Sequence, residues 1–194
     1  YKTNNINPSP KFAFIKGPVW DYGDLDMQEG IIDFVKNAPL DIVDLELDSI
    51  FSKAAKSHEI IMNGSIARSL YKYYENEKEK LHPFTVSRIE AGIPVSAKDY
   101  IEAIENAKLM EKSLKEVFKK YDAIITPAAP GQAPRDLMNT GNAIFNGYWT
   151  MMGIPAISLP LLNGKNNLPI GVQIITSWEN DLDLLKISEF ILNK

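Results

Sequence analysis

Residues 121–127 read YDAIITP, residues 153–160 read GIPAISLP and residues 168–174 read LPIGVQI. Each segment holds a short apolar run bounded by proline or glycine, which is typical of a buried strand. The turn-prone run NGKNN at 163–167 separates the last two segments. We therefore expect strands at 121–126, 156–159 and 170–175, all within a sheet-forming tail that covers residues 121–194.

Two helices are expected within this tail. After a loop rich in proline, glycine and alanine that runs to Pro134, residues 142–152 predict a helix that Gly153 and Pro155 end. Residues 181–192 predict a last amphipathic helix with Leu182, Leu185 and Ile191 pointing inward. The alternation of strands and helices is typical of an α/β protein with a mixed sheet flanked by helices.

The residues before the tail divide into two further segments. Residues 1–46 predict strand, helix and strand, with the strands at 12–15 and 41–47 and the helix at 27–35. Residues 47–120 predict helices, because apolar residues recur at three- to four-residue steps from 48 to 74. We expect a break at 63–65, a hinge-like passage around Pro83 and residues 92–94, and a helix from an N-cap at Ser96 to Lys120.

The composition excludes several classes of function. Apolar residues make up 45% and charged residues 24% of the 194 residues, as in an ordinary globular protein. A net charge of -4 argues against direct nucleic-acid binding, and no apolar run is long enough for a membrane helix. The sequence has no cysteine, which is compatible with a cytoplasmic setting. Because it opens on Tyr1 and Lys2 without methionine, we expect it to be cut from a longer protein.

The common catalytic motifs do not occur in this sequence. It contains no G-x-S-x-G elbow, no phosphate-binding loop before Lys165 and no G-x-G-x-x-G after a strand. His58 and Glu59 begin like a zinc-protease motif, but Met62 stands where the second histidine is needed. We therefore expect neither a metal nor a cofactor.

One part of the tail combines polar and aromatic residues in a way that suits a pocket wall. Thr140, Asn146 and Thr150 lie close in sequence to Phe145 and Trp149. Gly141 would let the backbone approach a ligand, while asparagine and tryptophan offer a directional amide and a flat apolar surface. The alternative interpretation is a core helix with Trp149 buried in it.

The order of these segments resembles the C-terminal signature of the amidase-signature family. The resemblance rests on the strand 121–127, Thr140-Gly141, Phe145-Asn146, Trp149-Thr150, the segment 153–160, the segment 168–174 and the acidic, leucine-rich start of the last helix. Arg88, Gly92 and residues 96–100 also fit the helix that precedes the first strand of this signature. The resemblance implies the C-terminal part of the amidase-signature fold and a small-molecule amide as substrate. It also places Thr140, Gly141, Asn146 and Trp149 on the acyl side of the substrate site.

The resemblance also implies which groups this chain lacks. Family members use a lysine, a serine held by a cis peptide bond and a nucleophilic serine, all upstream of the matched region. Neither Ser65, after a single glycine, nor Ser158, inside a strand, replaces them. We therefore expect no catalytic residue in this chain and no activity from it alone. The alternatives are a non-enzymatic α/β interaction domain and the A subunit of a tRNA-dependent amidotransferase.

One expectation concerns the surface of the chain. If a catalytic half is absent, the sheet around Ile124, Ile157 and Ile174 should have a bare apolar face. Such a face would favour association between copies of the chain into a homo-oligomer.

Overall fold

The computed structural model describes residue 7, residues 9–136 and residues 138–194. Tyr1 and Lys2, on which the expectation that the sequence is cut from a longer protein rests, lie outside this range. The strands are β1 (Lys11–Phe14), β2 (Asp41–Asp44), β3 (Ala123–Pro127), β4 (Ala156–Asn163) and β5 (Pro169–Ile175). The helices are α1 (Leu25–Asn37), α2 (Ala54–Glu77), α3 (Pro83–Gly92), α4 (Ala97–Val117), α5 (Ile144–Met151) and α6 (Asp181–Leu192), with short 3₁₀ turns at 20–22, 49–53 and 78–80.

The five strands form one mixed sheet in the order β2-β1-β3-β5-β4. β1 pairs in parallel with both β2 and β3, whereas β5 pairs antiparallel with β3 and β4. The predicted α/β class with a mixed sheet flanked by helices is confirmed. All five residues of β3 are buried, because this strand lies at the centre of the sheet with helices on both of its faces.

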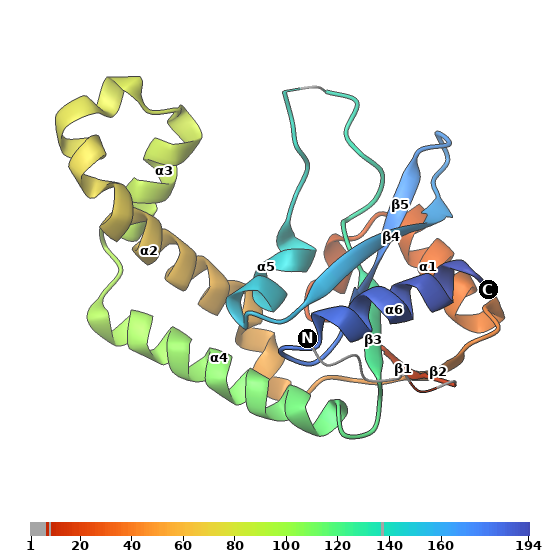
Figure 1. Ribbon diagram of the computed structural model, residues 1–194. Helices are drawn as coiled ribbons and strands as arrows, with labels where there is room; N and C mark the ends of the chain where they lie inside the picture. Colours follow the sequence, from red (N-terminus) through yellow and green to blue (C-terminus); the bar gives the residue numbers. More distant parts are fainter. Residues whose placement is uncertain (1–6, 8, 137) are drawn as a thin grey trace.

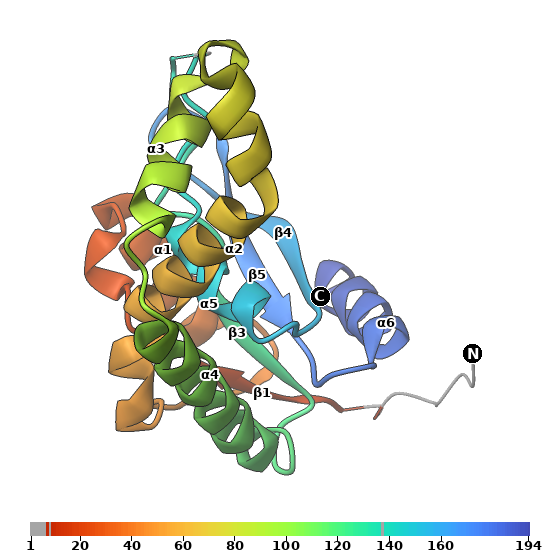
Figure 2. The same cartoon turned by 90° about the vertical axis from the view of Figure 1, so that its left-hand side faces the viewer.

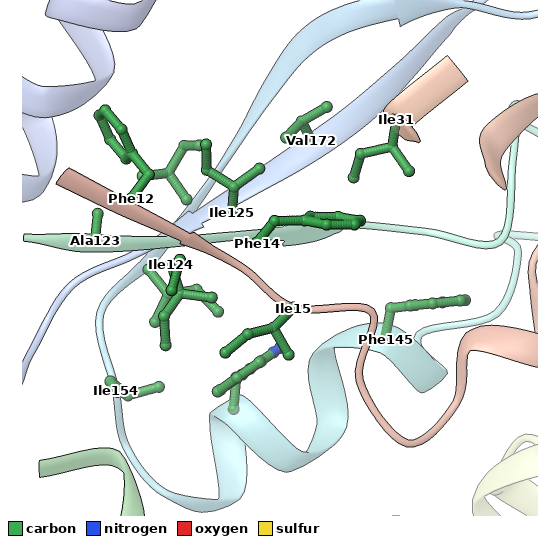
Figure 3. Packing of buried hydrophobic residues seen from close by; sticks show 14 of the residues in the cluster. Phe12, Phe14, Ile15, Ile31, Ala123, Ile124, Ile125, Phe145, Ile154 and Val172 are labelled. Atoms are coloured by element: carbon green, nitrogen blue, oxygen red, sulfur yellow. The ribbon is translucent and has the colours of Figure 1, made fainter. Parts of the chain in front are cut away.

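Alternate residues of the central strands pack on opposite faces of the sheet. Figure 3 shows Phe14 and Val172 on the same side as Ile31 of α1, and Ile15 and Ile124 on the side of α5. Helix α2 packs against α5, and α4 packs against α2. Helix α3 folds back along the outer part of α2, so that α2 and α3 form an arm away from the sheet (Figure 1). In Figure 2, α2, α3 and α4 run along the side that faces the viewer, and α6 lies to the right of β4 and β5.

Helices cover both faces of the sheet, and this corrects the expectation of a bare apolar face. Ile124 and Ile174 are fully buried and Ile157 is half-buried, so no bare apolar face surrounds them. The strand β4 is an edge strand, which explains how it continues through Pro160 to Asn163, beyond the predicted end at Leu159. At the other edge, β2 is shorter than predicted and ends at Asp44.

The helical segment differs from the prediction at two places. No break occurs at 63–65, because Gly64 lies inside α2, where a Cβ would come within 3.1 Å of the Tyr100 ring. The passage after Pro83 is the helix α3 rather than a hinge: Pro83 starts it, and Nδ1 of His82 accepts a hydrogen bond of 3.2 Å from the Phe84 N–H.

The ends of the later helices follow the sequence more closely. Ser96 is the N-cap of α4, and its Oγ accepts a hydrogen bond of 3.1 Å from the Asp99 N–H, as predicted. Helix α6 has the predicted bounds, but its inward residues are Leu184, Ile187 and Ile191. The predicted inward position of Leu185 is wrong, since this side chain is 56% exposed, and Leu182 is only half-buried.

Candidate functional site

The strand order creates a topological switch point at the carboxyl ends of β1 and β3. From β1 the chain crosses through α1 to β2 on one side, while β3 lies on the other side of β1. Connections that leave neighbouring parallel strands in opposite directions open a crevice at their carboxyl ends, and ligands bind there in open α/β sheets. The residues just after Phe14 and Pro127 therefore lie at the position that the topology favours for a ligand.

The exit from β1 is closely fitted to α5. Gly17 has a φ of 78°, and a Cβ on it would lie 2.5 Å from the hydroxyl oxygen of Tyr148. Only glycine combines this left-handed backbone with so close an approach. Gly17 and Tyr148 thus fix the distance between the end of β1 and α5.

The exit from β3 is a long loop, residues 128–143, which rises beyond the sheet and returns to α5 (Figure 1). Its far part is shaped by two side-chain turns. Oδ1 of Asn139 accepts a hydrogen bond of 2.9 Å from the Gly141 N–H, and Oδ1 of Asn142 accepts one of 3.0 Å from the Ile144 N–H. Thr140 and Gly141 are both exposed in this part of the loop, and Gly141 has a φ of 86°.

The base of the loop is tied to two other elements. Oε1 of Gln132 accepts a hydrogen bond of 3.1 Å from the Asn166 N–H in the turn between β4 and β5. Nε2 of Gln132 donates to Oδ2 of Asp26 on α1 over 3.2 Å, and the Arg135 guanidinium donates to Oδ1 of Asn166 over 3.0 Å. The loop is therefore anchored at its base and exposed at its far end.

A row of polar side chains crosses the sheet below α5. Gln173 on β5 is the register partner of both Thr126 on β3 and Ser158 on β4, so the three side chains lie on one face. Nε2 of Gln173 donates to Oδ1 of Asn146 over 2.7 Å, and Nδ2 of Asn146 donates to the Ala128 carbonyl over 3.0 Å. This relay connects β5, α5 and the first residue of the loop.

The same region holds four buried polar atoms without a hydrogen-bond partner among the described residues: Thr126 Oγ1, Tyr148 OH, Trp149 Nε1 and Gln173 Oε1. The Tyr148 and Trp149 rings are 4.7 Å apart between centroids. Burial raises the pKa of Tyr148, and its polar neighbours Trp149 and Thr126 offset part of this rise. The Tyr148 phenol therefore stays protonated at neutral pH, and the cluster carries no net charge.

The four predicted site residues occupy two different environments. Asn146 lies at the centre of the relay, whereas Trp149 lies in the core with 1% of its surface exposed. Thr140 and Gly141 lie farther along the loop, and within the described part of the chain no hydrogen bond joins them to Asn146 or Trp149. Sequence reasoning missed Gln173 and Gly17. A lone glutamine in an otherwise apolar strand, and a glycine directly after another strand, were the available signals.

Neither serine considered in the sequence has the surroundings of a nucleophile. Oγ of Ser65 lies 3.1 Å from the Tyr100 hydroxyl on the helical arm, and Ser158 is exposed on the edge strand β4. A serine needs an adjacent base to attack a carbonyl, and the described residues place none beside either of them. Also among the described residues, no three His, Asp or Glu side chains gather as a metal site, and no helix is long and apolar enough to cross a bilayer.

The chain resembles known proteins in sequence. The Amidase family model matches residues 28–185. The A subunit of the glutamyl-tRNA(Gln) amidotransferase of Brachyspira hyodysenteriae is 24% identical over 198 residues, which cover 84% of this chain and 41% of that protein. The corresponding protein of Saccharolobus solfataricus, which carries the same name, is 33% identical over 103 residues, which cover 47% of this chain and 20% of that protein.

Solved structures share the fold. A crystal structure of an amidase superposes with a TM-score of 0.82 at 15% identity, over 95% of this chain and 46% of that chain. The A subunit of the glutamyl-tRNA(Gln) amidotransferase of Thermotoga maritima superposes with a TM-score of 0.65 at 21% identity, over 92% of this chain and 41% of that chain. The chain thus spans less than half the length of these relatives. Since the family model covers most of its residues, the chain belongs to the amidase family.

Proposed function

We propose that this chain is the substrate-facing, C-terminal part of an amidase that hydrolyses the C–N bond of a small carboxamide. One observation carries the proposal: hydrogen-bonded polar side chains, Gln173 and Asn146, lie beside the start of the loop after β3, yet the described residues place no paired nucleophile and base there. A substrate-binding wall that needs a catalytic partner fits a chain that spans less than half of its relatives.

The chemistry would be divided between this chain and the rest of the protein. In the Ser-cisSer-Lys mechanism a neutral lysine amine draws a proton through the bridging serine, so that the second serine attacks the carbonyl carbon. The amine leaves, and water then releases the acid from the acyl-enzyme. These groups would come from outside the chain. Its own residues would bind the acyl part of the substrate and exclude water from it.

We further propose that Thr140, Gly141, Asn146 and Trp149 form the acyl side of the substrate site. The relay through Gln173 holds Asn146 and the start of the loop in place, which supports the assignment for Asn146. Thr140 and Gly141 are exposed in the turn-stabilised part of the loop, where a ligand would reach them. Trp149 would support the site from the core side of α5, since its indole is buried.

Steady-state kinetics of the longer gene product test this function. Purified protein should release ammonia or an amine from simple carboxamides, and Thr140→Ala should raise KM with a smaller effect on kcat, because binding interactions shared by substrate and transition state act on KM. A full-length protein that folds and binds but hydrolyses no amide would favour the non-enzymatic interaction domain instead.

A second candidate is the A subunit of a tRNA-dependent amidotransferase. The relatives from Brachyspira hyodysenteriae and Saccharolobus solfataricus favour it, because both carry that description. The net charge of -4 does not favour direct contact of this chain with tRNA. Native co-purification distinguishes the two functions: a stoichiometric complex with other proteins supports the amidotransferase, and amide hydrolysis by a single type of chain supports the amidase.

Association into a homo-oligomer stays a prediction, on a different surface from the one expected. One group of exposed apolar side chains lies on the helical arm and the start of α4, and includes Tyr71, Phe84, Ile93 and Ile101. Size-exclusion chromatography with light scattering measures the state directly. A mass of one chain at all concentrations would contradict the prediction.

A further inference from the structure

His58 on α2 is in direct contact with the backbone of α5. A Cβ on Gly147 would lie 2.6 Å from Nδ1 and 2.7 Å from Cε1 of the imidazole, so the ring occupies the place of a side chain on α5. Gly147 is buried and stands between Asn146 and Tyr148. The imidazole therefore contacts α5 between Asn146, which forms the relay, and Tyr148, which packs against Gly17 at the end of β1.

The helix that carries His58 is itself firmly held. The neighbouring Ser57 is buried, and its Oγ accepts a hydrogen bond of 3.3 Å from the buried Asn106 side chain on α4. On the opposite side of α5, Gln173 donates to Asn146 from the sheet. Helix α5 is thus clamped between an imidazole on α2 and an amide on β5.

The surroundings of the imidazole favour its neutral form. Loss of solvent through burial is the largest cause that lowers the pKa of His58, followed by the positive charge of Arg88 on α3, while Glu59 on α2 opposes both. The sequence of α5, IFNGYWTM, has no charged residue, and its one titratable group is the phenol of Tyr148. Gly147 also lies in the N-terminal half of α5, whose dipole repels a cation.

We propose that His58 is a positioning residue: its neutral imidazole, seated on Gly147, holds α5 and with it Asn146 against Gln173, and protonation of the ring loosens this contact. The consequence for catalysis rests on the proposed amidase function, whereas the coupling between His58 and α5 does not.

The direction of the pH effect follows from the lowered pKa. Above the ordinary histidine value of 6.5 the imidazole is neutral in both the folded and the unfolded chain, and the contact contributes its full stability. As the pH falls below this value the unfolded chain takes up the proton more readily than the folded one. The stability of the contact is therefore lost toward acid pH.

Hydrogen exchange of the 194-residue chain tests the coupling without an activity assay. Between about pH 7.5 and about pH 5.5, the protection factors of the α5 amides should fall severalfold, because the unfolded chain takes up the proton more readily than the folded one. In His58→Gln, which keeps a neutral polar side chain, they should change less than about twofold over the same range. His82→Gln removes the other histidine of the chain and should behave as the unmodified chain does.

Two further measurements keep the proposal open to refutation. Gly147→Ala should lower α5 protection at both pH values, because its Cβ would displace the imidazole. In the longer enzyme, acidification should raise KM more than it lowers kcat, and His58→Gln should remove this rise in KM. Equal α5 protection at both pH values in the unmodified chain, or an equal fall in His58→Gln, would overturn the inference. Pronounced coupling in a protein that hydrolyses no amide would overturn only the proposed function.

Discussion

At the scale of single residues, the relay from Gln173 through Asn146 to the Ala128 carbonyl is the main polar feature of the candidate site. Both of its hydrogen bonds lie in a region where water has little access, and Gln173 is 6% exposed. A buried polar group that loses its partner costs more than a hydrogen bond contributes, because it keeps its desolvation penalty. The relay is therefore a sensitive point of the structure.

Asn146→Ala should lower the free energy of unfolding by roughly 1–3 kcal/mol, since it leaves both Gln173 and the Ala128 carbonyl unpaired. Urea denaturation of the chain measures the change. Asn37→Ala is the matched control: this amide donates to Asp33 on the exposed side of α1, and its removal should cost within about 0.5 kcal/mol. Equal losses of unfolding free energy in the two variants would show that the relay contributes no more to stability than an exposed hydrogen bond.

Substitution of Trp149 distinguishes a structural role in the core from a role in the substrate site. Because the indole is 1% exposed, Trp149→Phe should lower the Tm of the longer protein by several degrees, through loss of packed volume. Its predicted place in the substrate site additionally requires that the ratios of kcat/KM among carboxamides change. A fall in Tm with unchanged ratios would remove Trp149 from the pocket and leave it in the core.

At the scale of elements, the helical arm depends on a close crossing of α2 and α3. A Cβ on Gly92 would overlap the Asn63 carbonyl and come within 2.7 Å of the Ala67 Cβ. Gly92→Ala should therefore destabilise the chain by roughly 1–3 kcal/mol, as overpacking does. Gly30 lies inside α1, and the methyl group of Gly30→Ala would be 3.5 Å from Leu162 on β4, an ordinary contact. This variant should raise the free energy of unfolding by about 0.5–1 kcal/mol. Urea midpoints that move in the same direction for both variants would contradict this account of the crossing.

The elements also show what sequence reasoning can and cannot reach. Helix α6 and the Ser96 cap were predictable, because local hydrogen bonding and periodicity fix them. The sequence does not predict α3, because a proline between two helical patterns also suits a hinge, although proline is favourable in a first helical turn. The break at Gly64 was wrongly expected because that glycine makes room for Tyr100, a contact distant in sequence.

The same limit applies to the site. Residue pattern and family resemblance predict a site in the loop after β3 and in α5, and the structure shows that Asn146 donates a hydrogen bond to the first residue of this loop. The assignment of the site residues stays a prediction. Gln173 was not predicted, since its partner lies 27 residues away and only strand pairing brings the two together. The burial of Trp149 agrees with the alternative interpretation of this segment as a core helix, which the sequence alone left open beside the pocket wall.

At the scale of the whole molecule, the chain has a well-covered sheet with a topological switch point, and its described residues place no base beside Ser65 or Ser158. Amide hydrolysis needs a positioned nucleophile and oxyanion donors, and one such donor alone accounts for about 3 to 4 kcal/mol of the barrier. The proposed enzyme is therefore divided into a part that binds, which is this chain, and a part that reacts.

Amide hydrolysis by the 194-residue chain, measured beside that of the longer gene product, tests this division most directly. We expect ammonia or amine release from simple carboxamides by the longer protein and none above the uncatalysed rate by the chain alone. Turnover by the chain alone that a single substitution, such as Ser65→Ala or Ser158→Ala, abolishes would contradict the account.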